Sequence, residues 1–340
     1  MHLFNVALIL FLGPLSLLSA TESGHNIIGC EIFAMDKKMI RKFPGELCAF
    51  MRDGQLLASE ESQIVSYGKK NNKLWTKEIK AHHQVNLNLA QEKFLVIGSR
   101  TVTPKNKAAA RSDVLYLINR HGDIEKSFDL FEQQAQFDKI AWNQAASRKF
   151  PIVWTPSRFS DASWELTHVN SFYEIPENSF AKVNSAFSKG NFIVNDISLM
   201  LVFVLSADLK KVLWQNRLST EAWTMYHDVQ VLENGHLLYY ENKTTNKSYT
   251  SLIEYDLQNN KIVWVYNRDP KKSFNAPHWG GIQLLKDKNI LFTDITSGPK
   301  SIVIDRSGKV LWEMQSPPKT YLQQIKRQDL TAFLYNNKGL

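Results

Sequence analysis

The chain has 340 residues, a formal net charge of +8 and 44% hydrophobic residues, which is enough apolar material for a sizeable core. Its lysines and arginines are spread along the sequence and accompany no nucleic-acid-binding motif, so we expect no nucleic-acid partner. The two cysteines, Cys30 and Cys48, lack the spacing of a zinc or redox motif, which argues against those two kinds of site.

The first feature along the chain is an apolar run from Leu3 to Ala20, followed by polar residues. This pattern is typical of a secretory signal peptide, residues 1–20, and predicts an exported protein that is periplasmic or secreted. An uncleaved anchor is the alternative. Because the run is short and contains Gly13 and Pro14, we expect no stable membrane span.

In an exported protein, Cys30 and Cys48 are free to form a disulfide. Such a bridge would stabilise the fold by about 3 kcal/mol in the chain-entropy model. Two buried thiols are the alternative, and the sequence does not decide between them.

A repeated ending organises the rest of the chain, with a turn followed by lysine, apolar residues and tryptophan. The tryptophans of this ending are Trp75, Trp214, Trp264 and Trp312. The last three are about 50 residues apart, which is a period typical of propeller blades. We expect these tryptophans to pack between neighbouring blades, where a large aromatic side chain adds buried area, and we expect no redox cofactor.

Short alternating strands bounded by Asn-Gly, Asp-Gly or Ser-Gly turns fill each unit. Five units begin near residues 49, 85, 169, 229 and 282. A sixth can be assembled from the two ends, with residues 320–335 giving its first strands and residues 27–43 its last, which would leave no free sheet edge. We therefore predict an all-β fold, a six-bladed propeller of four-stranded blades that forms a single domain over residues 21–340.

One long segment, residues 129–163, departs from the repeat. Segments of this length in a compact domain are usually functional or covering elements, so we interpret it as an insertion. Strands within residues 131–155 would instead make a seventh blade.

Histidines stand at or just before the first strand of several units. His83, His168 and His227 occupy matching positions, so the propeller predicts that they point together at one mouth of the central axis. Ordinary packing on the inner strands is the alternative. His278 lies further from its strand and fits both interpretations, while His82 is expected at a strand edge.

Four segments, in this order along the chain, resemble the bacterial arylsulfate sulfotransferases, which are exported six-bladed propellers, and their arylsulfotransferase-like relatives. The segments are Ala81–Val85, Trp164–Ser171, Tyr226–Gly235 and His278–Leu285. The similarity runs from about Asn71 to Trp312, most of the chain.

This resemblance implies transfer of a sulfuryl group from an aryl sulfate donor to a phenolic acceptor through a sulfohistidine, with no nucleotide cofactor. For this function we expect no metal. On the resemblance, His227 would be the nucleophile, and His168 and His83 would donate hydrogen bonds to sulfuryl or phenolic oxygens. The residue types suit this chemistry, because neutral imidazole is a nucleophile near neutral pH and a second histidine can protonate a phenolate.

The family pattern also has an arginine in the strand after the His168 segment, and here Ile197 stands near that position. Our hypothesis is that Arg100, at the equivalent position one blade earlier, replaces it as a catalytic residue. In the alternative, Arg100 belongs to a basic hairpin at the surface. The other basic residues of that hairpin are Lys105, Lys107 and Arg111.

Two other functions fit the same histidines. Imidazoles from separate strands are a ligand set for Zn²⁺ or Cu²⁺, with Asp228 as a further ligand or a hydrogen-bond partner. A non-catalytic exported propeller that binds a protein partner or a small ligand is the third possibility, and the missing arginine favours it.

Overall fold

The computed structural model describes residues 24–105, 107–149, 161–219, 224–244, 249–266, 276, 280–296, 298–316 and 325–328. The expected signal peptide and His278 lie outside these residues.

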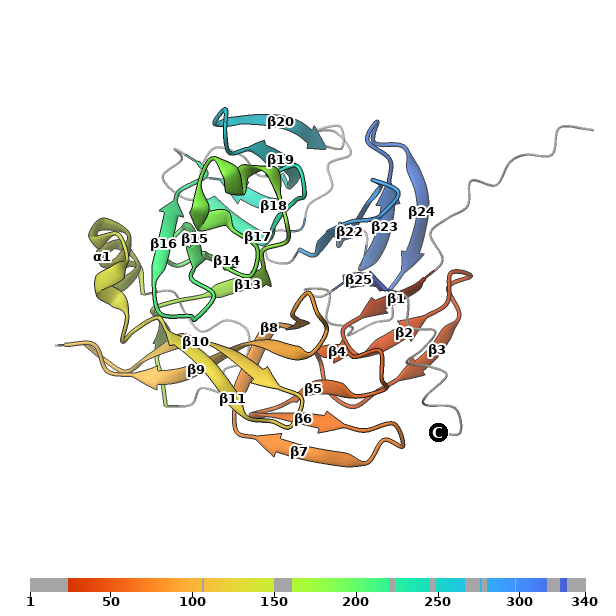
Figure 1. Ribbon diagram of the computed structural model, residues 1–340, viewed down its shortest axis with the longest axis horizontal. Coiled ribbons are helices and arrows are strands. Elements are labelled where there is room, and N and C mark those ends of the chain that lie inside the picture. The colour runs from red at the N-terminus through yellow and green to blue at the C-terminus, as the bar shows by residue number, and fades with distance from the viewer. Residues whose placement is uncertain are drawn as a thin grey trace, which may run out of the picture.

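Six antiparallel sheets are arranged around a central axis, as Figure 1 shows. Blade 1 contains β4 (Cys48–Phe50), β5 (Leu56–Glu60), β6 (Gln63–Tyr67) and β7 (Lys73–Lys77). Blade 2 contains β8 (Lys80–Leu87), β9 (Lys93–Val102), β10 (Ala110–Asn119) and β11 (Ile124–Asp129), with β12 (Trp164–Glu165) added parallel to β10. Blade 3 contains β13 (Val169–Glu174), β14 (Phe192–Asp196), β15 (Leu201–Leu205) and β16 (Val212–Asn216).

Blade 4 contains β17 (Thr224–Val231), β18 (Leu237–Thr244), β19 (Ser251–Asp256) and β20 (Lys261–Tyr266). Blade 5 contains β21 (Ile282–Leu284), β22 (Ile290–Asp294), β23 (Lys300–Ile304) and β24 (Val310–Gln315). Blade 6 contains β25 (Ile325–Gln328), β1 (His25–Ile28), β2 (Glu31–Phe33) and β3 (Met39–Lys42). The first strand of each blade lies nearest the axis, where β4, β8, β13 and β17 contact one another in turn. The predicted six-bladed propeller is confirmed.

The two ends of the chain share blade 6. β25 pairs antiparallel with β1, with Asn26 opposite Arg327 and Ile27 opposite Lys326. A disulfide between Cys30 and Cys48 then links blade 6 to blade 1. The sharing of one blade, as predicted, closes the ring without a free inner edge.

The outer-strand tryptophans join neighbouring blades. The indole N–H of Trp75 donates to the carbonyl of Arg120 in blade 2 at 2.9 Å, and that of Trp264 donates to the carbonyl of Arg306 in blade 5 at 2.9 Å. Trp312 donates to the carbonyl of Met35 in blade 6 at 3.2 Å. The predicted role of these tryptophans between blades is confirmed for these three.

The segment between blades 2 and 3 is helical where the structure describes it. It holds the 3₁₀ helix η1 (Gln134–Gln136) and helix α1 (Lys139–Arg148), which lies at the periphery of the propeller in Figure 1. Asp138 caps α1 by accepting from the amide of Ala141 at 2.7 Å. Phe137 and Trp142 pack against blade 3 in the apolar core, so the described part of the insertion adds no seventh blade.

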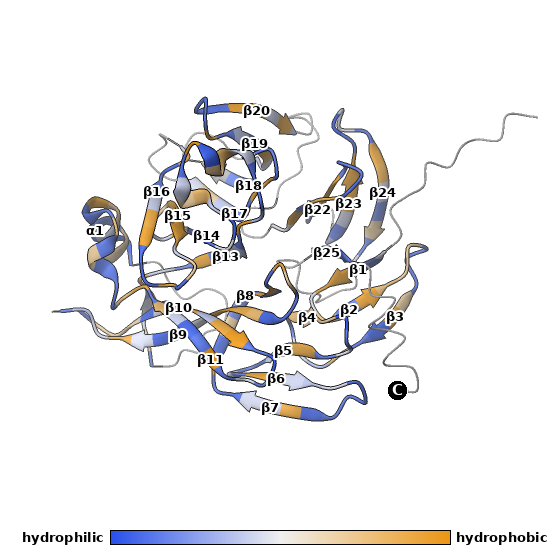
Figure 2. Ribbon diagram, viewed as in Figure 1, coloured by the Kyte–Doolittle hydropathy of each residue, from blue (hydrophilic) through white to orange (hydrophobic). Residues whose placement is uncertain are grey.

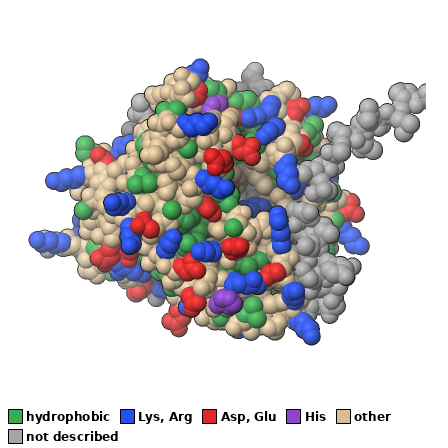
Figure 3. Space-filling model, viewed as in Figure 1, with side chains coloured by type: hydrophobic (Ala, Val, Ile, Leu, Met, Phe, Trp, Pro, Cys, Tyr) green, Lys and Arg blue, Asp and Glu red, His purple; other side chains and the backbone are tan. Residues whose placement is uncertain are grey.

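Apolar side chains of neighbouring blades share common cores, and hydrophobic residues recur along the strands in Figure 2. Leu57 and Ile64 of blade 1 pack with Val96 and Ile118 of blade 2, for example. Two further 3₁₀ helices, η3 (Ser179–Lys182) and η4 (Ser185–Phe187), connect β13 to β14. On the face in Figure 3, basic and acidic side chains are intermingled. Among the described residues, no helix has the length and hydropathy needed to cross a membrane.

Candidate active site

Three histidines from neighbouring blades lie together beside the axis. His83 lies on β8, His168 directly precedes β13, and His227 lies on β17. Nε2 of His83 is 3.0 Å from Nε2 of His168, and the ring centre of His83 is 6.4 Å from that of His227. The structure thus brings together the three histidines that the sequence predicted to converge.

Irregular backbone on the inner strands sets the direction of these side chains. His83 has a φ of 59°, and Asp228, the neighbour of His227, has a φ of 54°. The pairing register shifts at these positions in both β8 and β17. Left-handed φ is uncommon for residues other than glycine, and bulges of this kind re-aim side chains beside functional sites.

The histidines belong to a continuous hydrogen-bonded chain between two carboxylates. His82 Nε2 lies 3.0 Å from Oδ1 of Asp113, and Nδ1 of His82 meets Nδ1 of His83. His83 Nε2 meets Nε2 of His168, whose Nδ1 bonds to Oε2 of Glu165. We call this set, Asp113, His82, His83, His168 and Glu165, the histidine chain.

Both carboxylates of the histidine chain are ionised. Burial alone would raise the pKa of Asp113, but the charge of Arg111 and the contact with His82 hold that pKa well below its ordinary value. Burial also opposes ionisation of Glu165, yet His168 and Arg111 lower its pKa. Ionised carboxylates only accept hydrogen bonds, so the protons at both ends of the chain must come from the histidines.

Counting protons gives the charge of the histidine chain. Its four hydrogen bonds need four N–H protons, and three neutral imidazoles supply only three. Burial, followed by the charge of Arg111, lowers the pKa of His82 to about 4, and burial with the neighbouring histidines lowers the pKa of His83 well below 6.5. The histidine chain therefore holds one proton more than three neutral imidazoles supply.

A buried arginine supports this chain. Arg111, 2% exposed, donates from Nη1 to Oε1 of Glu165 at 2.8 Å and from Nη2 to Oδ1 of Asp113 at 2.9 Å. Nη2 of Arg111 is also 3.2 Å from Nε2 of His82. That His82 nitrogen lies closer, at 3.0 Å, to Oδ1 of Asp113, to which it donates. The expectation that Arg111 belongs to a surface hairpin is wrong. The sequence does indicate that Arg111 has a partner, because Asp113 follows two residues later and residues i and i+2 share one face of a strand.

The family model for Arylsulfotransferase (ASST) matches residues 56–317, well over half of the chain. The chain belongs to the arylsulfotransferase family. This match supports an arylsulfotransferase-like function at the level of the family. It also agrees with the family that the histidine segments resemble.

Among solved structures, the chain is similar to a Bacteroides caccae protein of unknown function, with 14% identity and a TM-score of 0.58, over 90% of this chain and 99% of that one. It is also similar to the Myceliophteria thermophila Cps50 (Swd1) β-propeller domain, with 9% identity and a TM-score of 0.49, over 88% of each chain. At such low identity the first similarity concerns the fold alone. No curated protein matches the chain.

The arginine of the family pattern is not replaced by Arg100 in this arylsulfotransferase-family chain. Its Nη2 donates to Oε1 of Glu132 at 2.7 Å and its Nε donates to Asp129. Asp129 ends β11, the outermost strand of blade 2, so these partners hold the Arg100 side chain away from the histidines. Ile197, near the expected arginine position, is buried beside His168, and its amide donates to the His168 carbonyl at 3.0 Å.

His227 is held in one tautomer by its neighbour on β18. Asn242 donates from Nδ2 to the carbonyl of Ala276, which can only accept, so the amide oxygen of Asn242 faces the imidazole. His227 Nδ1 lies 2.5 Å from that oxygen and must donate to it. When the imidazole is neutral, the lone pair of His227 therefore resides on Nε2, as a nucleophilic imidazole requires.

Two aspartates, Asp196 and Asp113, fix the backbone around His168 by accepting hydrogen bonds from its amides. The His168 amide donates to Oδ2 of Asp196 at 2.9 Å, and the Val169 amide donates to Oδ2 of Asp113 at 2.7 Å. Burial, with the nearby charge of Asp113, raises the pKa of Asp196 to about 7. Since these bonds anchor the main chain, the side chain of His168 has a defined position between His83 and Glu165.

The histidines of the site are almost closed to solvent, at 2% exposed for His83, 5% for His168 and 2% for His227. A substrate can reach Nε2 of His227 only if the cluster opens. Among the described residues, no group of three or more histidine, cysteine, aspartate or glutamate side chains has a geometry that would hold a metal ion. His278, the fourth candidate histidine, lies outside those residues.

Proposed function

We propose that this arylsulfotransferase-family propeller moves a sulfuryl group from an aryl sulfate to a phenol, with His227 as the nucleophile. The observation that supports the proposal most is the convergence of His227 with His83 and His168 beside one axis. His227 offers a lone pair on Nε2, and the histidine chain offers one proton more than neutral imidazoles would hold. Nucleophile and proton donor are the two groups that this reaction needs.

In the first half-reaction, Nε2 of His227 attacks the sulfur atom of the aryl sulfate. The bond between sulfur and the aryl oxygen breaks, and its electron pair leaves with the phenolate. The extra proton of the histidine chain passes to the phenolate oxygen, which leaves as a phenol. The three imidazoles of the histidine chain are then neutral, and His227 carries the sulfuryl group.

In the second half-reaction, an acceptor phenol gives its proton to the histidine chain, which returns to its starting charge. The phenolate oxygen attacks sulfur, the bond between sulfur and Nε2 breaks, and the electron pair returns to His227. Two aromatic alcohols have exchanged one sulfuryl group. No cofactor or net proton is consumed.

The histidine chain supplies a proton that can move, whereas the family pattern has the fixed positive charge of an arginine. The charge of Arg111 is matched by the carboxylates of Asp113 and Glu165. One oxyanion-stabilising donor is worth about 10²- to 10³-fold in rate. We therefore expect turnover slower by about this factor than an equivalent site with the arginine in place of Ile197.

Export belongs to the same proposal. The apolar run of residues 3–20 supports it, and so does the disulfide between Cys30 and Cys48, because disulfides persist in oxidising compartments. Amino-terminal sequencing of the protein from its native host should give a mature chain that begins just after Ala20. A chain that begins at Met1 in the cytoplasm would contradict export.

The assay for transfer follows 4-nitrophenol release from 4-nitrophenyl sulfate, with and without phenol as acceptor. We expect phenol-dependent release by the wild type and none by His227→Ala. The matched control is His121→Ala, which removes an exposed turn histidine and should leave the rate unchanged. Equal release by the wild type and His227→Ala would contradict the proposal.

A non-catalytic propeller that binds a ligand or a protein is the second candidate. The burial of the three histidines and the presence of Ile197 favour it, because both reduce access and charge stabilisation at the site. It becomes the better account if the wild type releases no 4-nitrophenol above His227→Ala.

A further inference from the structure

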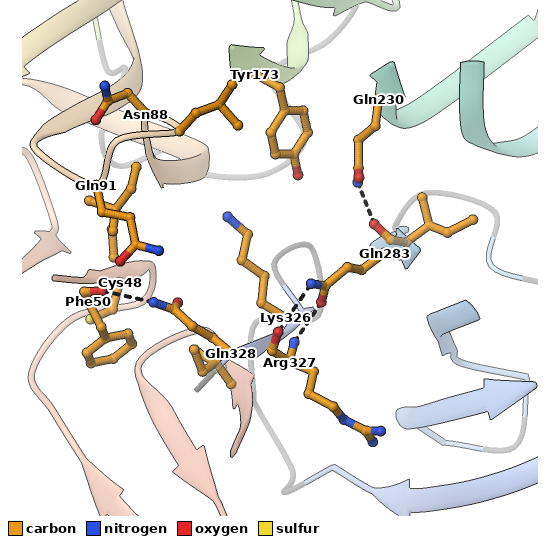
Figure 4. A pocket seen from close by; sticks show the side chains of 15 residues that line it. Cys48, Phe50, Asn88, Gln91, Tyr173, Gln230, Gln283, Lys326, Arg327 and Gln328 are labelled. Atoms are coloured by element: carbon orange, nitrogen blue, oxygen red, sulfur yellow. Dashed lines mark hydrogen bonds between the residues drawn. The ribbon is translucent and has the colours of Figure 1, made fainter. Parts of the chain in front are cut away.

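A pocket of about 320 Å³, shown in Figure 4, opens at the later ends of several inner strands. Leu87, Tyr173 and Gln230 line it from the later parts of β8, β13 and β17, whereas the histidines stand at or before the earlier parts of the same strands. β25 adds Lys326 and Gln328. The volume is in the range of sites for small molecules.

A layer of hydrogen bonds across the axis separates this pocket from the histidines. Gln84 Nε2 lies 2.8 Å from Oδ1 of Asp228 and 2.9 Å from the hydroxyl oxygen of Tyr173, which also bonds to Asp228. Oδ2 of Asp228 accepts from the amide of Ile282 at 2.6 Å. The pocket is therefore a site distinct from the one to which we assign sulfuryl transfer.

Two cationic residues, Lys326 and Arg327, line the pocket, and the side chain of Lys326 points into the cavity in Figure 4. Its ammonium group donates to Oδ1 of Asn86 and lies 5.6 Å from the ring centre of Tyr173. Burial lowers the pKa of Lys326 to about 8, against the opposing charge of Asp228, so the group is still mainly protonated at neutral pH. An ammonium has three protons, which leaves donors for an anion in the cavity.

Glutamine side chains surround Lys326, and three of them are fixed by backbone groups. Gln230 donates to the carbonyl of Ile282 at 2.6 Å and Gln328 donates to that of Phe50 at 3.2 Å. Gln283 donates to the carbonyl of Arg327 at 3.2 Å and accepts from its amide at 2.7 Å. These amides hold defined positions before any ligand binds, which lowers the entropy cost of binding.

Gln91 differs from the other glutamines. It has a φ of 58° in the turn after β8, and its Oε1 atom is buried without a hydrogen-bond partner among the described residues. Its amide nitrogen, by contrast, faces the cavity in Figure 4 and can donate to a ligand. Leu87 and Leu89 also line the pocket and add apolar side chains to it.

We propose that this pocket binds a small carboxylate that also carries hydroxyl groups, such as a sugar acid. The carboxylate pairs with the ammonium of Lys326, the amide nitrogen of Gln91 donates to a hydroxyl oxygen, and the carbon skeleton lies against Leu87. The proposal does not depend on sulfuryl transfer, because neither His227 nor the histidine chain lines the pocket.

Isothermal titration calorimetry of the whole protein with glucuronate tests the proposal. Glucose serves as the uncharged control, and gluconate and 4-hydroxybenzoate serve as further carboxylates. We expect glucuronate to bind at least about tenfold more tightly than glucose, because a hydrogen bond to a charged group is stronger than one to a neutral group. Lys326→Met should weaken glucuronate binding by at least about tenfold, and Gln91→Ala by several fold. Lys189→Met, which removes an exposed lysine elsewhere, should bind as the wild type does.

Binding should also survive His227→Ala, which keeps this test separate from that of the transfer activity. The proposal is overturned if none of the three carboxylates binds, if glucose binds as tightly as glucuronate, or if a folded Lys326→Met variant keeps wild-type affinity. Loss of binding in His227→Ala would place the ligand at the histidines and would also overturn it. Circular dichroism of each variant establishes that it is folded.

Discussion

Nε2 of His168 lies 3.0 Å from Nε2 of His83, although the two histidines belong to different blades and are 85 positions apart. This contact joins two shorter segments, one ending on Asp113 and the other on Glu165, into a single hydrogen-bonded chain. Because both ends only accept, the chain must hold an additional proton. The propeller thus places this proton near His227, whose tautomer is set by the contact with Asn242.

Replacing Asn242 tests the tautomer of His227. Asn242→Leu removes the acceptor of the Nδ1 proton, so the imidazole is free to move that proton to Nε2 and lose its nucleophilic lone pair. We expect the rate of 4-nitrophenol release to fall by about tenfold or more, the equivalent of one hydrogen bond. Asn242→Asp keeps an acceptor and should retain more activity than Asn242→Leu. The reverse order would contradict the tautomer assignment.

Two arginine substitutions should separate a buried ion-pair network from an exposed one. Arg111→Met leaves Asp113 and Glu165 buried without their cation, and we expect the free energy of unfolding to fall by about 3–5 kcal/mol. Arg100→Met breaks pairs at a side chain that is 39% exposed, so we expect a loss of at most about 1 kcal/mol. Urea denaturation of both variants measures the difference. Equal losses would show that the Arg111 network is not a buried support.

The pH dependence of stability should carry the signature of His82. Its pKa in the folded chain is about 4, below the ordinary 6.5, so between these values the unfolded chain binds more protons. The free energy of unfolding should therefore fall as pH drops from 6.5 to 4, with about 3 kcal/mol attributable to His82. In His82→Asn this part disappears. Urea denaturation at pH 7 and at pH 4 measures it, and an equal pH dependence in both proteins would contradict the burial of a neutral His82.

The disulfide should stabilise the closure of the ring. Cys30 and Cys48 are 18 positions apart, and a loop of that length contributes about 3 kcal/mol in the chain-entropy model. We expect the double variant Cys30→Ser, Cys48→Ser to lose about this much free energy of unfolding in denaturant. A reductant should destabilise the wild type by a similar amount and leave the double variant unchanged. An unaltered wild type under full reduction would contradict the assignment.

The blade count and the closure could be predicted from the sequence because they depend on local, repeated features. Trp264 and Trp312 lie on outer strands and reach a turn of the next blade, so the spacing of such tryptophans reports the spacing of blades. The alternation of the inner strands also located His83 and His227 near the axis. These features need no knowledge of long-range contacts.

The rest of the site depends on departures from regular strands. His82 was expected at a strand edge, since alternation places it opposite His83, but the left-handed residue at position 83 breaks the alternation and both imidazoles become buried. Arg111 was missed because an arginine in a strand resembles an exposed edge residue until its partners are known. Arg100 was expected near the histidines. Its side chain is instead held by Asp129 and Glu132, which are 29 and 32 positions away in the sequence.

The most direct measurement is the mass of the peptide that contains His227 after reaction with 4-nitrophenyl sulfate in the absence of phenol. The proposed mechanism predicts a gain equal to one sulfuryl group on His227, which disappears when phenol is added before the reaction is stopped in base. A peptide that never gains this mass, or a gain of the same size in His227→Ala, would contradict a sulfohistidine at this residue.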